Sequence, residues 1–448
     1  MSRYKAYPEY KDSGVEWLGV IPKRWEVLRH KYIAYFTKGK NPAVLLDVPA
    51  ENTLPYLSMD CLRSNSVEKH AIVSTDVRIA VEDQPLIIWD GSNAGEFVLG
   101  RRGILSSTMA AATLNYPLHI KYYWYLCIAI EPEMRRHATG MGIPHVNGEE
   151  LKNIQLTIPS FTEQNTIADF LDNETAKIDK LIDKQQQLIE LLKEKRQAVI
   201  SHAVTKGLNS DVPMKHSGFK WLGEVPEHWD TARVKNISSF ITSGPRGWSD
   251  FITDEGSEIF LQSGDLNNNL GLEINKAKRV SPPKNAEGIR TRLIEGDVVV
   301  CITGANTGRI AVVPKLSQTT YINQHLSLIR PQRTRVNSTF LGFSLTSTSG
   351  RSFFDVAQYG LKEGLNLSNI CEAPLALAPK NEQDLIVNHL KFINIKYDQL
   401  SRISATQVEL LQERRTALIS AAVTGKIDVR GWVAPEKQEF EEPQETTA

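Results

Sequence analysis

The chain has 448 residues, of which 41% are hydrophobic and 23% charged, so each of two or three ordinary domains could bury a core. It carries 52 lysines and arginines against 52 aspartates and glutamates, a formal net charge of zero. This balance excludes a uniformly basic nucleic-acid binder, although it allows local basic faces. The first residues lack an apolar signal core, and the longest apolar run, Tyr122–Ile130, is too short to cross a bilayer. We therefore expect a cytoplasmic protein.

Two long segments of the first half recur in the second half. Residues 13–33 match residues 217–237 at ten of 21 positions, around the shared pattern W-L-G-x-x-P-x-x-W. Chance would give about one or two identities. Residues 163–208 match residues 382–427 at 18 of 46 positions without a gap. These matches indicate an internal duplication in which each half is a globular segment followed by a helix.

The first globular segment, residues 1–159, has the mixed pattern of an α+β fold. Short runs of β-branched and aromatic residues are bounded by Gly, Asn and Pro, which is typical of strands. The expected strands are Leu54–Met59, Leu86–Trp89, Glu96–Leu99 and Asn153–Ile158, and Tyr122–Ile130 is expected to be a short helix.

A long helix is predicted over residues 160–207. Ser160 and Glu163 form a capping box at its start, and Gly207 provides the left-handed residue that ends many helices. Its apolar residues follow a heptad repeat, which predicts coiled-coil packing. The predicted seam includes Ile167, Leu171, Ile178, Leu181, Leu188, Leu192 and Val199.

The second half repeats this order. Residues 208–378 form a second globe, with strands expected at Glu258–Leu261, Asp297–Ile302, Ile310–Val313 and His325–Ile329 and a helix at Thr339–Ser347. A second long helix is predicted over residues 379–427. Its seam includes Ile386, Leu390, Ile393, Tyr397, Leu400, Leu411 and Leu418. Residues 428–448 are expected to form an acidic, disordered tail.

Further apolar residues lie beside both seams, among them Phe170, Ile182, Ile189 and Val408. They widen the apolar stripe of each helix, and a wide stripe suits burial against more than one partner. Two interpretations stay open: the helices form an intramolecular pair, or they also receive helices from another subunit.

Motifs for catalysis and metal binding are absent from the sequence. Ser281-Pro282-Pro283-Lys284 resembles the motif of amino-methyltransferases, but Lys284 cannot stack on a flipped base as an aromatic residue does. No phosphate-binding loop, H-E-x-x-H pair or C-x-x-C pair occurs. We therefore predict no catalytic residue, no metal site and no cofactor in this chain. The turns Gly91–Gly95 and Gly304–Gly308 share the pattern G-x-N-x-G and are interpreted as tight turns, with phosphate contact as the lesser alternative.

The combination of motifs resembles the specificity subunits of type I restriction–modification enzymes. The resemblance rests on WLGVIPKRW and WLGEVPEHW, and on IPSFTEQNTIADFL and APKNEQDLIVNHL before the two helices. It implies two target recognition domains separated by two antiparallel coiled-coil helices, with pseudo-twofold symmetry. Each domain would read one half of a bipartite, asymmetric sequence in double-stranded DNA.

The resemblance also implies partners. The helices would set the half-site spacing and dock two methyltransferase subunits, which carry S-adenosylmethionine, while restriction subunits would supply ATP- and Mg-dependent cleavage. The chain by itself would be non-catalytic. Two alternatives stay open: a self-contained restriction or methylation enzyme, and a coiled-coil adaptor that binds no DNA.

Basic residues in the globes are the candidates for DNA contact, because Arg and Lys bind phosphate and Arg can pair with guanine. They are Arg101, Arg102, Lys276, Lys278, Arg279, Arg290, Arg292, Arg309, Arg333 and Arg335. The tryptophans of the two W-L-G elements are interpreted instead as packing anchors, since indoles close to a proline form a fixed corner.

Overall fold

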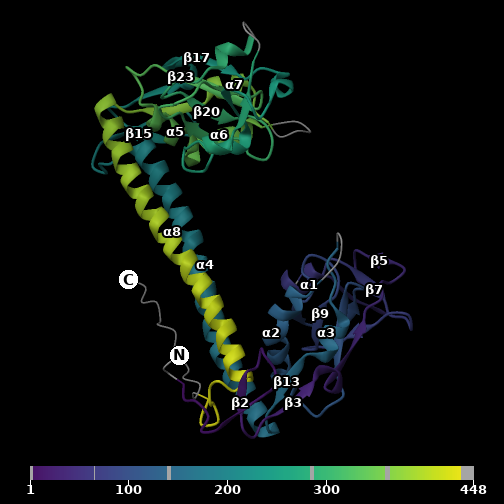
Figure 1. The fold of residues 1–448 in the computed structure, drawn as a ribbon. Helices are drawn as coiled ribbons and strands as arrows, with labels where there is room; N and C mark the ends of the chain where they lie inside the picture. Colours follow the sequence, from purple (N-terminus) through teal and green to yellow (C-terminus); the bar gives the residue numbers. More distant parts are fainter. Residues whose placement is uncertain (1–3, 65, 139–142, 283–286, 359–363, 435–448) are drawn as a thin grey trace. The chain divides into compact units, whose positions relative to one another are not determined.

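The computed structural model describes residues 4–64, 66–138, 143–282, 287–358 and 364–434. The chain divides into two units: unit 1 is residues 1–185 with 406–448, and unit 2 is residues 186–405. The long helices α4 (Phe161–Lys206) and α8 (Lys380–Val423) each contribute one half to each unit (Figure 1). This division differs from the predicted boundaries, which gave each helix a segment of its own, because each half of a helix packs with a different globe.

Unit 1 contains a four-stranded antiparallel sheet in the order β10-β9-β12-β4 and a mixed five-stranded sheet in the order β5-β7-β6-β11-β8. Two further pairs are β1-β2 and β13-β3. The strands are β1 (Tyr10–Asp12), β2 (Val20–Pro22), β3 (Glu26–Arg29), β4 (Ala34–Lys38), β5 (Leu45–Leu46), β6 (Thr53–Leu57), β7 (His70–Ile72), β8 (Ile79–Ala80), β9 (Pro85–Ile88), β10 (Phe97–Leu99), β11 (Gly103–Leu105), β12 (Met109–Leu114) and β13 (Gln155–Ile158). Its short helices are α1 (Met59–Ser64), α2 (Ile120–Arg136) and α3 (Gly148–Asn153).

Unit 2 contains the four-stranded sheet β17-β23-β20-β21, the three-stranded sheet β19-β18-β22 and the pairs β14-β15 and β16-β24. Its strands are β14 (Met214–His216), β15 (Glu224–Pro226), β16 (Asp230–Arg233), β17 (Ser238–Ser243), β18 (Glu258–Leu261), β19 (Lys278–Val280), β20 (Val298–Cys301), β21 (Ile310–Val312), β22 (Thr320–Ile322), β23 (Leu326–Pro331) and β24 (Pro374–Leu377). Its short helices are α5 (Ser338–Thr346), α6 (Thr348–Ala357) and α7 (Leu367–Glu372).

The two four-stranded sheets have the same topology, so the duplication extends into globes whose sequences differ. Strands β4, β9, β10 and β12 of unit 1 take the places of β17, β20, β21 and β23 in unit 2. In each unit a further strand that follows the W-L-G element pairs with the strand just before a long helix, β3 with β13 and β16 with β24. All eight strands and both short helices named from the sequence are confirmed, with bounds that shift by a few residues.

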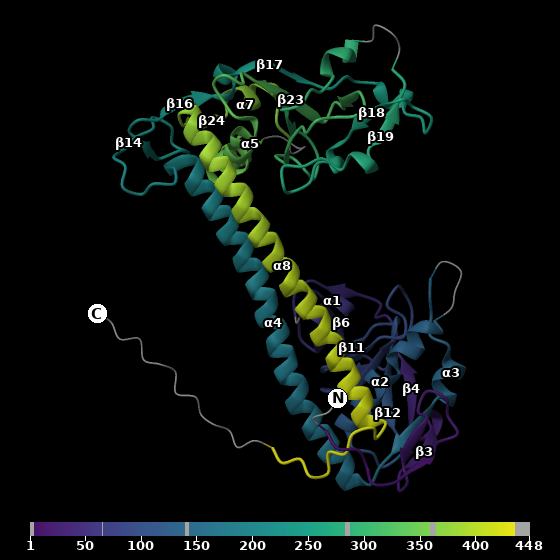
Figure 2. The same ribbon diagram turned by 60° about the vertical axis from the view of Figure 1, so that its left-hand side comes forward.

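Within each unit, the half of α4 and the half of α8 run antiparallel (Figures 1 and 2). In unit 1, Ile167 and Leu171 share a core with Ile419 and Ala422, and the Arg415 guanidinium Nε lies 2.8 Å from Asp179 Oδ1. In unit 2, Ile200 and Val204 share a core with Ile386 and Leu390, and Arg196 Nη1 lies 2.7 Å from Asp398 Oδ1. The Arg and Asp of one unit correspond to those of the other in the duplicated sequence. No helix in the described ranges combines the length and apolarity needed to span a membrane.

In the middle of the long helices, the predicted seam is right at one of its two heptad positions and wrong at the other. Residues at the first position are buried or half-buried there, and residues at the second position are exposed. Ile167, Leu171, Ile178, Ile386 and Leu390 are buried, and Leu192, Val199, Ile393, Tyr397, Leu411 and Leu418 are half-buried. Leu181, Leu188 and Leu400 are instead 47%, 42% and 49% exposed. The neighbouring side chains Ile182 and Ile189 turn inward in place of Leu181 and Leu188. Both residues of each such pair are apolar, so hydrophobic pattern alone could not decide which one faces the partner helix.

The predicted disordered tail begins too early. Val429 is buried, the Asp428 N–H donates to the Lys5 carbonyl, and the Trp432 ring meets Phe170 edge to face at 5.8 Å between centroids. Val429 and Trp432 are apolar and pack against the core of unit 1. The acidic part of the tail begins only after them. Residues 435–448 lie outside the described residues.

A buried histidine should make the stability of unit 1 sensitive to acid. His30 Nδ1 lies 3.0 Å from the Leu151 carbonyl oxygen and Nε2 lies 2.8 Å from the Tyr123 hydroxyl, and burial lowers the His30 pKa from 6.5 to about 4. Below pH 6.5 the unfolded chain gains a proton that the folded chain excludes, so the free energy of unfolding falls progressively towards pH 4. We expect unit 1 to lose about 2 kcal/mol between pH 7.5 and pH 5. Hydrogen exchange of the β3 and β13 amides measures this loss.

The duplication supplies the control for this prediction. Val234, which is fully buried, occupies the corresponding position in unit 2. His30→Val should therefore lower the stability of unit 1 at neutral pH, since the Tyr123 hydroxyl loses its bond to His30, but should flatten the pH dependence of that stability between pH 7.5 and pH 5. An unchanged pH dependence in this variant would assign the effect to other groups.

Candidate functional site

The repeated tryptophans join each globe to the helices. Trp25 and Trp229 are almost completely buried, and their indole N–H groups donate to Glu163 Oε1 at 3.4 Å and Glu382 Oε2 at 3.0 Å. These glutamates begin α4 and α8 and belong to the repeated E-Q dipeptide. The prediction that these tryptophans are packing anchors is confirmed for Trp25 and Trp229.

The glutamines of the same dipeptide connect each long helix to a shorter helix of its globe, α4 to α2 in unit 1 and α8 to α5 in unit 2. Gln164 Oε1 accepts the His119 N–H at 2.9 Å at the start of α2, and Gln383 Oε1 accepts the Asn337 N–H at 2.7 Å at the start of α5. Gln383 Nε2 also donates to the carbonyl oxygens of Ala378 and Arg335 at 2.8 and 3.0 Å. The E-Q dipeptide is therefore a structural joint, used once in each unit.

Gln383→Ala should destabilise unit 2 by about 1–3 kcal/mol, because a buried N–H and two carbonyl groups lose their partner. Gln399→Ala is the matched control: Gln399 lies exposed on the same helix in unit 2, and its loss should change stability by less than about 0.5 kcal/mol. Hydrogen exchange of the α5 amides compares the two variants. Equal effects would show that the Gln383 contacts contribute little.

The two G-x-N-x-G turns occupy equivalent places. The turn at 91–95 links β9 to β10, and the turn at 304–308 links β20 to β21. In each turn both glycines have positive φ, at 109° and 91° in unit 1 and 89° and 80° in unit 2, which explains the glycines sterically. Each turn lies beside the segment before α3 or α7: the Gly91 N–H donates to the Pro144 carbonyl, and the Leu365 N–H to the Ile302 carbonyl.

The candidate basic residues do not gather in one place. In unit 1, Arg101 turns inward, where its guanidinium contacts the Cys61 carbonyl and Sγ, and only Arg102 is exposed. In unit 2, Lys276 pairs with Glu273 at 3.4 Å, and Arg335 Nη1 donates to the Asn236 carbonyl at 2.7 Å.

The remaining candidates of unit 2 fall into separate groups. Lys278 and Arg292 lie in one row across the three-stranded sheet, because the register runs from Lys278 through Phe260 and Tyr321 to Arg292. Arg279 and Arg290, which are close to these two residues in the sequence, are also exposed. Arg279 donates to the Gly256 carbonyl, and Arg290 donates to the Thr242 hydroxyl. Arg333 is exposed beside Gly296, while Arg309 is half-buried and lines a groove. DNA contact by these residues stays a prediction.

The groove, which the sequence did not reveal, lies in unit 2 and has a volume of about 570 Å³. Its walls are the turn at 304–308 with the two residues that follow it, the loop that contains Asn267 and Asn268, and one face of α6. It is lined by Gln197, Asn267, Asn268, Ala305, Asn306, Thr307, Gly308, Arg309, Ile310, Thr346, Thr348, Arg351, Ser352 and Asp355. Arg351 was missed because it stands alone in the sequence, and only the fold places it beside Arg309.

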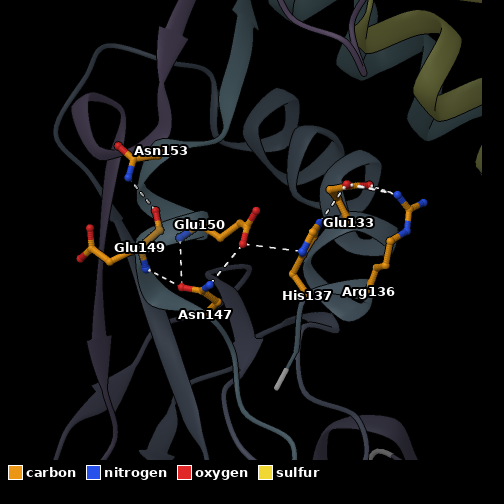
Figure 3. A network of polar contacts seen from close by, with 7 residues as sticks. All are labelled: Glu133, Arg136, His137, Asn147, Glu149, Glu150 and Asn153. Atoms are coloured by element: carbon orange, nitrogen blue, oxygen red, sulfur yellow. Dashed lines mark hydrogen bonds and ion pairs between the residues drawn. The ribbon is translucent and has the colours of Figure 1, made fainter. Parts of the chain in front are cut away.

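A polar network in unit 1 connects the end of α2 to α3 (Figure 3). Asn147 caps α3 by accepting the N–H groups of Glu149 and Glu150, and His137 lies between Glu133 at 3.2 Å and Glu150 at 3.7 Å. In unit 2, Asn366 caps α7 by accepting the Asn369 N–H. Neither this network nor any other group of side chains in the described residues has the arrangement of a metal site. We interpret it as a structural link.

Comparison with known proteins agrees with the motifs. The family model described as the type I restriction modification DNA specificity domain matches residues 22–191. The specificity subunit of the type I restriction enzyme MjaVIII of Methanocaldococcus jannaschii is 26% identical over 420 residues, which cover 92% of this chain and 94% of that protein. In sequence the chain is similar to the specificity subunits of type I restriction–modification enzymes. The EcoBI specificity subunit of Escherichia coli, at 21% identity, matches 68% of this chain and 65% of its own length.

The fold is also that of a solved relative. A chain from a type I restriction–modification system, solved to explain complex assembly and conformational transition, superposes with a TM-score of 0.69 at 15% identity. The match covers 91% of this chain and 99% of that chain. The motifs that carry the resemblance, the W-L-G elements and the E-Q dipeptides, are thus the joints between globe and helix.

Proposed function

We propose that this chain is the DNA sequence-specificity subunit of a type I restriction–modification complex, in which each globe reads one half of a bipartite, asymmetric site. The observation that carries the proposal is the repetition of one joint and one sheet topology under two globes that differ in sequence. Similar frames suit two half-sites on one duplex, and different surfaces suit two different half-site sequences.

The chain is proposed to act without catalysis of its own. Double-stranded DNA is its target, and two methyltransferase subunits and the restriction subunits are its proposed partners. S-adenosylmethionine, ATP and Mg would be bound by those partners rather than by this chain, whose sequence carries no phosphate-binding loop. The names of the relatives place them in type I restriction enzymes, and this supports the same kind of assembly here.

The outward apolar side chains of the long helices are the proposed docking surface for the methyltransferase subunits. In unit 2, Leu385, Phe392, Ile395 and Ile403 of α8 follow one another at helical spacings, and each is more than half exposed. Side chains of this size are rarely left in water along a whole helix face. Their exposure fits the interpretation that the helices receive a second partner.

Replacing Phe392 and Ile403 by serine should weaken binding of the methyltransferase subunit at least about tenfold, because each buried side chain contributes about 1.5–3 kcal/mol. The fold should persist, since both residues are exposed. Size-exclusion chromatography of the co-expressed subunits measures the association. Leu390→Ser, at a buried position of the same helix, is the contrasting variant and should unfold unit 2. Full association of the double variant would exclude this surface.

The function is tested by selecting DNA from a random pool with the chain and its methyltransferase partner, at several salt concentrations. Enrichment of a split sequence with two unlike halves is the expected result. Cleavage or methylation by the purified chain alone would support a self-contained enzyme. The absence of any DNA binding by the assembled complex would support an adaptor scaffold.

A further inference from the structure

The G-x-N-x-G turns have opposite electrostatic surroundings in the two units. In unit 1 the residue after the turn is Glu96, whose carboxylate lies 2.6 Å from Arg63 Nη2 and 3.9 Å from Arg135 Nη1. In unit 2 the corresponding residue is Arg309, and its side chain lines the groove. The charge beside the turn is thus balanced by the Glu96 carboxylate in unit 1, whereas the side chain after the turn in unit 2 is positively charged.

Arg351 adds a second positive charge directly over the turn of unit 2. A Cβ atom on Gly308 would collide with the Arg351 guanidinium, so the two groups are in contact. The side chain of Arg351 is 47% exposed, and its Nε lies 3.5 Å from Asp355 Oδ1, a loose pairing. Arg309 is more firmly held, because its Nη1 donates to the Leu266 carbonyl at 3.0 Å.

The backbone of this turn also offers hydrogen-bond donors. The Thr307, Gly308 and Arg309 N–H groups donate to carbonyl groups of the turn or of β20, whereas those of Ala305 and Asn306 have no acceptor in the described part of the chain. Successive backbone N–H groups beside guanidinium groups are a common arrangement for binding a phosphate.

We propose that the groove of unit 2 binds a backbone phosphate of double-stranded DNA, with Arg351 and the N–H groups of Ala305 and Asn306 as its contacts and Arg309 supporting the charge. The inference rests on the proposed DNA-reading function and assigns it a site. It gives unit 2 a phosphate anchor that the equivalent turn of unit 1 lacks, since the Glu96 carboxylate lies there. Because phosphates carry no base identity, the anchor would set affinity and register without selecting a sequence.

The test uses the full chain assembled with its methyltransferase partner, and measures binding of a duplex that carries the recognised site over a range of salt concentrations. Arg351→Gln should lower the steepness of the plot of log K against log salt by about one unit, and should weaken site-bearing and random duplexes by the same factor. Asp355→Asn, which removes the carboxylate beside Arg351, should instead tighten both. Arg135→Gln, at the equivalent turn of unit 1, should leave the salt dependence unchanged.

Further measurements separate the possible failures. If the unaltered complex binds no DNA, the proposed function fails rather than the site. If that complex binds but Arg351→Gln and Arg135→Gln behave alike, or if Asp355→Asn weakens binding, the groove is not a phosphate anchor. Titration with ATP and with inorganic phosphate should show no binding that depends on Arg351 at millimolar concentration; such binding with an unchanged DNA salt dependence would assign the groove to a free phosphate compound and overturn the proposal.

Discussion

Replacing residues 208–378 with the corresponding segment of a relative that has a different second half-site should change one half of the methylated sequence completely and leave the other half as it was. The reason is structural: β16 and β24 pair with each other, so a replacement that carries both strands preserves the sheet that joins this globe to the helices. The donor segment also brings its own W-L-G element, which packs against Glu382 at the start of α8. Sequencing of methylated DNA from cells that carry the hybrid measures the result.

The reciprocal replacement of residues 1–159 is the matched control and should change only the other half. A hybrid that keeps β16 but exchanges β24 should lose activity, because the pairing of Thr231 with Ala376 would join strands of different origin. If both halves of the site changed together in the complete hybrid, the globes would not read independently.

Insertion of one heptad after Lys184 and another after Ile403 should either add about three base pairs between the half-sites or abolish activity. Seven residues lengthen a helix by about 10 Å, and the rise of the duplex is about 3.4 Å per base pair. The inward positions Ile182, Gln185 and Ile189 keep their phase in the heptad repeat after such an insertion, so the helix pairing should persist. Activity depends on whether the added rotation along the duplex is tolerated.

Insertion of a single residue at each point is the contrasting change. It turns the following helix by about 100° and would place Ile189 on the outer face. This variant should be less stable than the heptad variant and inactive. Unchanged spacing with full activity in the heptad variant would show that the helices do not set the distance between half-sites.

The parts of the fold that were predictable share strong local signals. The long helices have caps, terminal glycines and heptad repeats, and the strands are short apolar runs between turn residues. The seam was misassigned at Leu181 and Leu188 because their neighbours Ile182 and Ile189 are equally apolar. The shared sheet topology could not be predicted, because strand order depends on contacts between distant residues such as Val299 and Leu328.

The candidate site was less accessible from sequence for a similar reason. Arg101 is basic but turns towards Cys61, and nothing in its neighbourhood along the chain shows this. Arg351 lies 42 positions after Arg309 in the sequence, so their common groove exists only in the folded unit. The E-Q dipeptide was recognisable as a repeat, but its role as a joint required the bonds of Gln164 and Gln383 to be seen.

Sequencing the methylated bases in a host that carries this chain with its methyltransferase and restriction subunits tests the central claim most directly. Two unlike half-sites separated by a fixed number of unspecified base pairs, with adenine methylated in both, is the predicted result. A continuous or palindromic methylated sequence, or no methylation that depends on this chain, would contradict the assignment of one half-site to each globe.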